Sequence, residues 1–274
     1  MTTLNTRSNP AVARFRAARE GRDERSIFVE GRRLLEELLD STLPPRETAV
    51  TPAVASDPRM GPLMEALRVR GASVYTVSPS VMEFISDLET PPGIAVRADR
   101  PLPHDLSSIV TLGAPPPLIV LLDALQTPSN VGAIVRSAEA AGVTAVGILP
   151  GTADPLSPKA LRASAGSAFR VPLFRAESIP SFMGSFATPP TLLAADAKGP
   201  RTYSEWDWRN PCVLILGGEA RGVSPQSIGT LPVEHIKIPM AGRVESLNVA
   251  VAAGIILMEA QRQRTNADAP SAVA

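Results

Sequence analysis

Cysteine and histidine are nearly absent from this 274-residue sequence, which contains one Cys and two His. The single cysteine, Cys212, cannot form an intrachain disulfide, and this fits a protein of a reducing compartment. His104 and His235 have no Cys, His or acidic neighbours at the spacing of metal ligands. We therefore expect neither a disulfide framework nor a bound metal.

Long apolar runs are also absent, because the chain contains no stretch of about 18 consecutive apolar residues. Residues Met1–Pro10 lack an apolar core of the length that a signal peptide needs. We therefore expect a cytoplasmic protein with no membrane partner. The hydrophobic share of 44% and the charged share of 20% are ordinary for a globular chain that buries a core.

Lysine is scarce, since Lys159, Lys198 and Lys237 are the only lysines among 27 basic residues. The remaining basic residues are arginines, which make bidentate contacts with phosphate and stack on bases. A biased genome composition, also visible in the many Ala and Pro residues, is the competing explanation for this excess. The formal net charge is zero, so bulk electrostatics neither requires nor excludes nucleic acid.

The pattern of apolar segments predicts two domains, as the chain length suggests. Strand and helix patterns alternate over residues 1–100, and five prolines within 101–117 indicate a stiff linker. Leu118–Leu122 is a continuous apolar run, typical of a parallel strand covered on both faces. The alternation continues beyond it, so the sequence predicts a second α/β domain over 118–265, with a mostly parallel sheet, and a flexible tail over 266–274.

Three polar segments follow predicted strands of the second domain, at the edge where open α/β sheets bind ligands. Their members are Asn130 and Arg136, then Gly217, Gly218 and Glu219, and finally Ser246 and Asn248. Together they supply amides, a carboxylate and a guanidinium, which suits a small polar ligand and a phosphate-bearing substrate. Taken singly, each segment is equally compatible with a capped helix or a glycine turn.

The glycine-rich turn does not match the common nucleotide-binding motifs. The spacing G-x-G-x-x-G is missing from it, and so is the Gly-Lys-Ser/Thr of a phosphate-binding loop. The turn alone is therefore a weak indication of function.

In this order, the three segments resemble motifs 1, 2 and 3 of the SpoU (TrmH-like) RNA 2′-O-ribose methyltransferases, within the SPOUT α/β-knot superfamily. Arg25–Gly31, together with Glu89–Ile94, is similar to the N-terminal L30e-like substrate-binding domain of that family. Lys159–Pro172 is similar to the middle segment of the family. The resemblance thus covers nearly the whole chain.

The resemblance implies a trefoil knot in the second domain, a homodimer, and S-adenosyl-L-methionine as the methyl donor. The cofactor contacts it implies are Gly217, Gly218, Ile238, Met240 and Leu247. The catalytic cluster it implies is Asn130, Arg136, Glu219, Ser246 and Asn248.

The substrate implied by the resemblance is RNA, and the separate N-terminal domain favours ribosomal RNA over transfer RNA. Five arginines near that domain are candidates for contacts with RNA phosphates, namely Arg14, Arg16, Arg19, Arg25 and Arg32. The alternative is a solvated helix face whose arginines pair with Glu20, Asp23 and Glu24.

Two positions depart from the usual pattern of the family. Ala220 stands where the second motif usually has glycine, and Glu245 stands where the third motif often has serine. These departures keep open the alternative of an RNA-binding module whose knot domain is catalytically weak. A tRNA 2′-O-methyltransferase is a separate alternative. A nucleotide-binding α/β enzyme without a knot is a further alternative, which would bind NAD or ATP instead of S-adenosylmethionine.

Overall fold

The computed structural model describes residues 2–104, 116–218, 222–223 and 225–267. Contacts between Cα atoms divide the chain into two compact units, each described here by itself. Unit 1 comprises Met1–Leu102 and Pro155–Arg170, and unit 2 comprises Pro103–Asp154 and Val171–Ala274. Segment 155–170, which the sequence places within the second domain, therefore clusters with unit 1.

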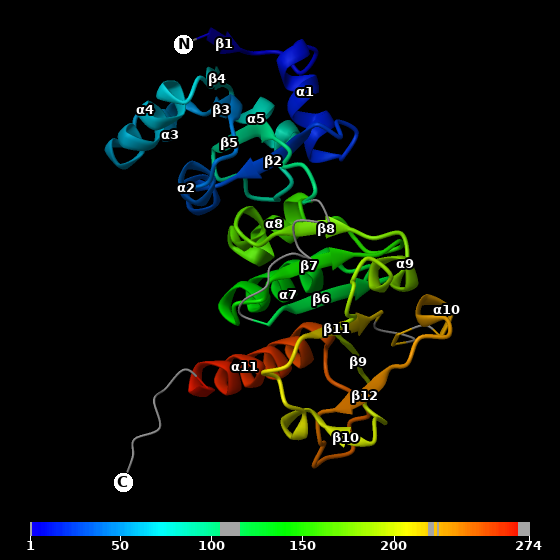
Figure 1. Ribbon diagram of the computed structural model, residues 1–274. Coiled ribbons are helices and arrows are strands. Elements are labelled where there is room, and N and C mark those ends of the chain that lie inside the picture. Colours follow the sequence, from blue (N-terminus) through cyan, green and yellow to red (C-terminus); the bar gives the residue numbers. More distant parts are fainter. Residues whose placement is uncertain (1, 105–115, 219–221, 224, 268–274) are drawn as a thin grey trace. The chain divides into compact units, whose positions relative to one another are not determined.

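Unit 1 is built on a five-stranded mixed sheet (Figure 1). In spatial order its strands are β1 (Thr2–Leu4), β4 (Ser73–Val77), β3 (Pro45–Val50), β5 (Ile94–Asp99) and β2 (Ser26–Glu30). Strands β1, β4 and β3 are parallel, whereas β5 runs antiparallel to both β3 and β2.

Helices cover the sheet of unit 1. They are α1 (Pro10–Arg19), α2 (Arg32–Asp40), α3 (Pro52–Ala55), α4 (Gly61–Val69), α5 (Pro79–Ile85) and α8 (Pro158–Ser164). Helix α1 begins after Asn9, whose Oδ1 accepts from the amide of Ala11 at 2.9 Å, and Pro10 fits the first turn because its missing N–H needs no partner there. Helices α1 and α5 pack on one face of the sheet, through buried residues such as Phe15, Phe28 and Ile85.

Unit 2 is built on a seven-stranded sheet in which every pair of neighbours is parallel (Figure 1). In spatial order the strands are β10 (Arg201–Thr202), β12 (Glu234–Lys237), β9 (Thr191–Ala195), β11 (Cys212–Gly217), β6 (Leu118–Asp123), β7 (Ala145–Ile148) and β8 (Leu173–Arg175). Every residue of β6 and β11 is buried, as expected for central parallel strands. The predicted α/β class with a mostly parallel sheet is confirmed.

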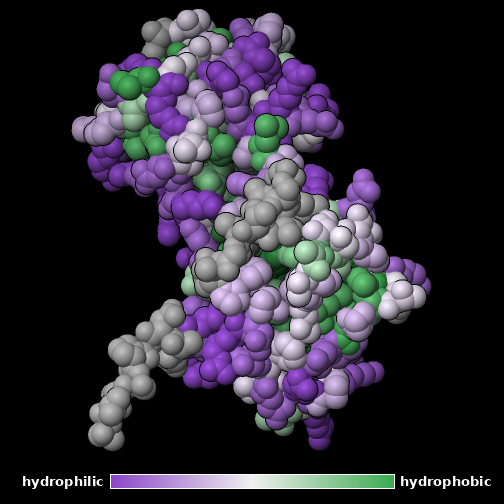
Figure 2. Space-filling model, in the orientation of Figure 1, coloured by the Kyte–Doolittle hydropathy of each residue, from purple (hydrophilic) through white to green (hydrophobic). Residues whose placement is uncertain are grey.

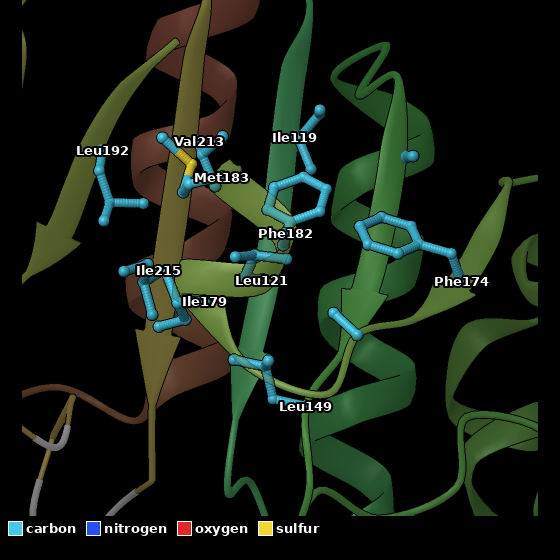
Figure 3. Packing of buried hydrophobic residues seen from close by; sticks show 12 residues of the cluster. Ile119, Leu121, Leu149, Phe174, Ile179, Phe182, Met183, Leu192, Val213 and Ile215 are labelled. Carbon is cyan, nitrogen blue, oxygen red and sulfur yellow. The ribbon is translucent and has the colours of Figure 1, made fainter. Parts of the chain in front are cut away.

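Two pairs of helices sandwich this sheet. They are α9 (Ile179–Met183) with α10 (Pro225–Ile228), and α7 (Pro128–Ala140) with α11 (Val249–Ala267). Figure 3 shows the core on the α9 face, where Phe174 and Phe182 stack with ring centroids 5.2 Å apart and α7 and α11 lie behind the strands.

Cys212 lies at the start of β11 and is fully buried. Burial raises the pKa of its thiol to about 11. A buried thiol with a raised pKa is a poor nucleophile, so Cys212 has a packing role.

The sequence pattern does not predict two short strands, β1 and β10. They have three and two residues, too few to show an alternation. None of the described helices is long and apolar enough to span a membrane. In the face shown in Figure 2, hydrophilic residues cover most of unit 1.

We predict that Gly147→Ala lowers the stability of unit 2. A Cβ at Gly147 would lie 2.4 Å from Leu121 Cδ2 and 2.5 Å from Phe174 Cζ, and both side chains are buried in the core. Such overpacking costs about 1–3 kcal/mol. Gly61→Ala is the matched control, because a Cβ there meets nothing within 4 Å. Thermal unfolding should show a lower Tm for Gly147→Ala alone, and equal Tm values for both variants would contradict the packing.

Candidate active site

The three polar segments identified in the sequence open at one edge of the sheet of unit 2. The first follows β6, the second follows β11, and the third follows β12. Strand β11 lies directly beside β6, with Gly217 opposite Asp123, and β9 alone separates β11 from β12. Because all these strands are parallel, their carboxyl ends share one edge, and that edge is where such sheets bind ligands.

Asn248 joins the third segment to the first. Its Oδ1 accepts from the amides of Ala250 at 2.9 Å and Val251 at 3.3 Å, so it is the N-cap of α11. Its Nδ2 also donates to Oδ1 of Asn130, in the first turn of α7, at 3.2 Å. The capping alternative is thus confirmed for Asn248, and the same side chain ties two of the motifs together.

The turn after β11 requires glycine for steric reasons. A Cβ at Gly217 would lie 2.1 Å from the carbonyl carbon of Gly222, and one at Gly218 would lie 2.9 Å from the carbonyl oxygen of Ala124. The amide of Gly222 donates to the carbonyl of Gly218 at 2.8 Å, which closes the turn. The predicted residue Glu219 and the variant position Ala220 lie outside the described residues.

The other predicted site residues differ in their exposure. Arg136 is exposed on α7, more than a turn beyond Asn130, and within the described residues it has no ion pair. Ser246 and Glu245 are exposed in the loop before α11. The predicted cofactor residues in this region, which are Ile238, Met240 and Leu247, are half-buried.

Sequence inspection missed three residues at this edge. Asp123 is buried at the end of β6, and its Oδ1 accepts from the hydroxyl of Ser227 on α10 at 3.0 Å. Ala124 follows with a φ of 55°, which is strained for a residue with a Cβ. A carboxylate directly after a buried strand was the signal that could have identified Asp123, whereas the strain at Ala124 leaves no trace in the sequence.

Two of the candidate RNA-binding arginines have structural partners within unit 1. Arg14 donates through Nε to both carboxylate oxygens of buried Glu47, at 3.2 and 3.0 Å, and Arg97 donates to the same group at 2.7 Å. Burial alone would raise the pKa of Glu47, but these two guanidinium groups outweigh it and lower the pKa. Arg19 donates to three backbone carbonyls at the end of α5, at 2.7 to 3.2 Å.

Arg16, Arg19 and Arg22 also share the carboxylate of Glu20, as the alternative interpretation of this helix predicts. Hydrogen bonds from Arg22 and then Arg16 lower the pKa of Glu20 to about 2. Arg32 pairs with Glu36 at 2.8 Å, while the side chain of Arg25 has no ion pair among the described residues. A contact of these arginines with RNA stays a prediction.

The described residues contain no group of three or more His, Cys, Asp or Glu that could hold a metal ion.

Residues 117–258 match the model of the SpoU rRNA Methylase family, and this range includes the whole sheet of unit 2. The chain belongs to the SpoU rRNA methylase family. Residues 11–96, in unit 1, match the MRM3-like substrate binding domain.

Relatives match this SpoU chain over nearly its whole length. A protein of Synechocystis, described as an uncharacterized tRNA/rRNA methyltransferase, is 31% identical over 98% of this chain and 97% of its own. The AdoMet-bound rRNA methyltransferase from Sinorhizobium meliloti superposes with a TM-score of 0.81 at 28% identity, covering 95% of this chain and 97% of its own. A crystallised RNA 2′-O ribose methyltransferase gives a TM-score of 0.75 at 26% identity, over 96% and 100%.

The protein is therefore a tRNA/rRNA methyltransferase of the SpoU family, and its cofactor is S-adenosylmethionine. The site fits this cofactor, because Gly217 and Gly218 let backbone groups approach a ligand where a Cβ would collide. Ile238, Met240 and Leu247, in the segment that follows β12, are half-buried and apolar, which suits a ligand with both apolar and polar parts.

We predict that Gly217→Ala weakens cofactor binding by at least about tenfold, or about 1.4 kcal/mol. The added Cβ would meet backbone atoms of Gly222, which cannot move aside without opening the turn. Gly242→Ala, in the loop of the third motif, is the control, because a Cβ there meets nothing within 4 Å. Isothermal titration calorimetry measures the affinity of both variants for S-adenosylmethionine. Similar affinities of the two variants would show that the turn is not part of the cofactor site.

Proposed function

We propose that this SpoU methyltransferase transfers the methyl group to a ribose 2′-hydroxyl of ribosomal RNA. The observation that carries the proposal is the meeting of the three motifs at one sheet edge, with the Asn248–Asn130 hydrogen bond linking the third motif to the first. The similarity to an RNA 2′-O ribose methyltransferase over 96% of the chain supports the ribose hydroxyl as the acceptor.

The proposed catalytic set contains Asn130, Arg136, Glu219, Ser246 and Asn248. S-adenosylmethionine supplies an electrophilic methyl group when it is bound. The 2′-hydroxyl is a poor nucleophile, and the exposed guanidinium of Arg136 stabilises the negative charge that develops as its proton leaves. A guanidinium that already carries its proton has no lone pair to accept another one, so we assign the proton to an RNA phosphate or water.

Asn130 and Asn248 have a positioning role in this proposal. Their hydrogen bond at 3.2 Å holds the first turn of α7 against the start of α11. Since Arg136 extends from the same helix, the bond limits where its guanidinium can reach. Positioning of this kind contributes several kcal/mol to catalysis, because a reacting pair held in the correct geometry need not lose freedom in the transition state.

Ribosomal RNA is favoured over transfer RNA by the extent of the similarity. The rRNA methyltransferase of Sinorhizobium meliloti matches both units of this chain, including the unit that carries the MRM3-like substrate binding domain. A second unit, in addition to the catalytic one, suits a large substrate that is recognised by its folded shape.

Replacing Arg136 tests the catalytic proposal. We expect Arg136→Ala to lose at least about 100-fold in methyl transfer, as is typical when one stabilising donor is removed, and to bind the cofactor normally. Arg209→Ala is the control, because Arg209 is an exposed arginine of the same unit that pairs with Asp207. Radiolabelled methyl transfer to total RNA gives the rates, and near-normal turnover by Arg136→Ala would refute its role. A wild-type protein that binds cofactor and RNA without any transfer would favour the catalytically weak module.

We also propose that two copies of the chain associate through α11. This helix presents Val251 and Met258 to solvent, 52% and 47% exposed, although its other face already packs in unit 2. The first half of α11, residues 249–258, contains no polar side chain. An apolar helical segment of this kind is normally covered, and a second copy of the same helix would cover it.

The dimer proposal predicts that Met258→Glu dissociates the protein, because a buried carboxylate at the interface would be unpaired. Val69→Glu is a control in unit 1, where Val69 is 77% exposed on α4. Analytical ultracentrifugation should show a dimer for the wild type and for Val69→Glu, and a monomer for Met258→Glu. A wild-type monomer would contradict the proposal.

A further inference from the structure

Segment 155–170 has an unusual place in the chain. It lies in sequence between β7 and β8, which are neighbours in the catalytic sheet, but it packs into unit 1. The chain therefore passes between the two units three times, after Leu102, after Asp154 and after Arg170. Two of these passages belong to one short segment, which residues 149–154 connect to β7 and residues 171–172 connect to β8.

A buried ion pair attaches this segment to unit 1. Arg162 on α8 donates through Nη1 to Oε1 of Glu30 at 3.2 Å and through Nη2 to Oδ2 of Asp87 at 2.7 Å. The Glu30 side chain is 1% exposed, at the end of β2. The hydroxyl of Ser86 donates to its other oxygen at 2.7 Å, and the amide of Asp87 donates to Oε1 at 3.3 Å.

The turn after α8 presses on α2 and gives the segment a second attachment. A Cβ at Gly166 would lie 2.6 Å from Cβ of Glu37, and the φ of Gly166 is 88°. Arg170, at the end of the segment, pairs with the carboxylate of the same Glu37. The segment is therefore held at its helix and at its exit, both times by arginine and glutamate.

The contact of Arg162 with Glu30 attaches the segment to unit 1 by an ion pair. Burial raises the pKa of Glu30, against the opposing influence of Ser86 and Arg162, so the charged carboxylate is costly at this position. Apolar side chains of similar volume would give equal or greater stability than a buried ion pair. What the pair does provide is one orientation, because Glu30 is fixed by Ser86 and Asp87 and accepts Arg162 from one direction.

We infer that Arg162 is a positioning residue of the methyl-transfer reaction, which acts by fastening the 155–170 segment of the catalytic chain to the substrate-binding unit through Glu30 and Asp87. RNA binding by unit 1 is thereby linked, through the segment itself, to strands β7 and β8 of the catalytic sheet. This inference rests on the proposed function, because it assumes that the substrate bound by unit 1 is the molecule methylated by unit 2.

Arg162→Met tests the inference by separating turnover from binding. We expect kcat on ribosomal RNA to fall by about 10- to 100-fold, in line with the effect of a small misplacement of a substrate. The Kd for RNA and the Kd for S-adenosylmethionine, each measured alone, should stay within twofold of the wild type. Arg162→Lys, which keeps the charge, should recover part of the loss and also covers the case in which Arg162→Met does not fold.

Arg46→Met is the matched control, because Arg46 forms an ion pair with Asp99 in the same unit but is exposed. Glu30→Gln should lower kcat as Arg162→Met does, and the double variant should be no worse than either single one, since the two side chains act as one element. Normal turnover by Arg162→Met, or an equal loss in Arg46→Met, would overturn the inference.

A binding measurement separates failure of this inference from failure of the proposed function. In the wild type, bound ribosomal RNA should change the Kd for S-adenosylmethionine, because the inference links the RNA-binding unit to the sheet that binds the cofactor. Such a coupling between two sites is reciprocal. Arg162→Met should abolish this coupling, whatever the position of methylation. If the wild-type enzyme methylates an RNA position other than a ribose 2′-hydroxyl, the proposal of 2′-O transfer fails and the inference about Arg162 stands. If the coupling persists in Arg162→Met, the inference fails and the proposed function stands.

Discussion

The packing of α7 against α11 is the constraint on which the site depends. These helices cover the same face of the parallel sheet, and each begins at its carboxyl edge, after β6 and after the loop that follows β12. Asn248 caps α11 and also reaches Asn130 at 3.2 Å, so a single side chain both starts a helix and joins two motifs that lie 118 residues apart. Gly217 and Gly218 lie at the same edge, where neighbouring backbone atoms occupy the space that a Cβ would need.

Much of the catalytic unit could be predicted because its strands carry strong local signals. The apolar runs of β6 and β11 and the proline-led start of α7 are visible in short windows of sequence. The meeting of the motifs at one edge also follows from parallel pairing. The contact between Asn130 and Asn248 could not be predicted from spacing, because it depends on how two helices pack. The knot implied by the family resemblance involves a loop with undescribed residues and stays a prediction.

Unit 1 shows the limit of inference from residue type. Its arginines indicate phosphate binding, yet Arg14 and Arg19 hold Glu47 and the end of α5 in place. Likewise, the alternation of strands places α8 within the catalytic domain, but Arg162 finds its carboxylate partners on unit 1. Both outcomes depend on contacts of arginines with groups that are distant in sequence, and composition does not determine those contacts.

The central claim is that this SpoU methyltransferase modifies a ribose hydroxyl of ribosomal RNA. The most direct measurement is mass spectrometry of nucleosides from ribosomal RNA, after incubation of the purified protein with S-adenosylmethionine that carries a labelled methyl group. The account predicts the label in one nucleoside methylated on its 2′-oxygen, with little label in transfer RNA. Label on a base would contradict the proposed chemistry, and label in transfer RNA alone would contradict the proposed substrate.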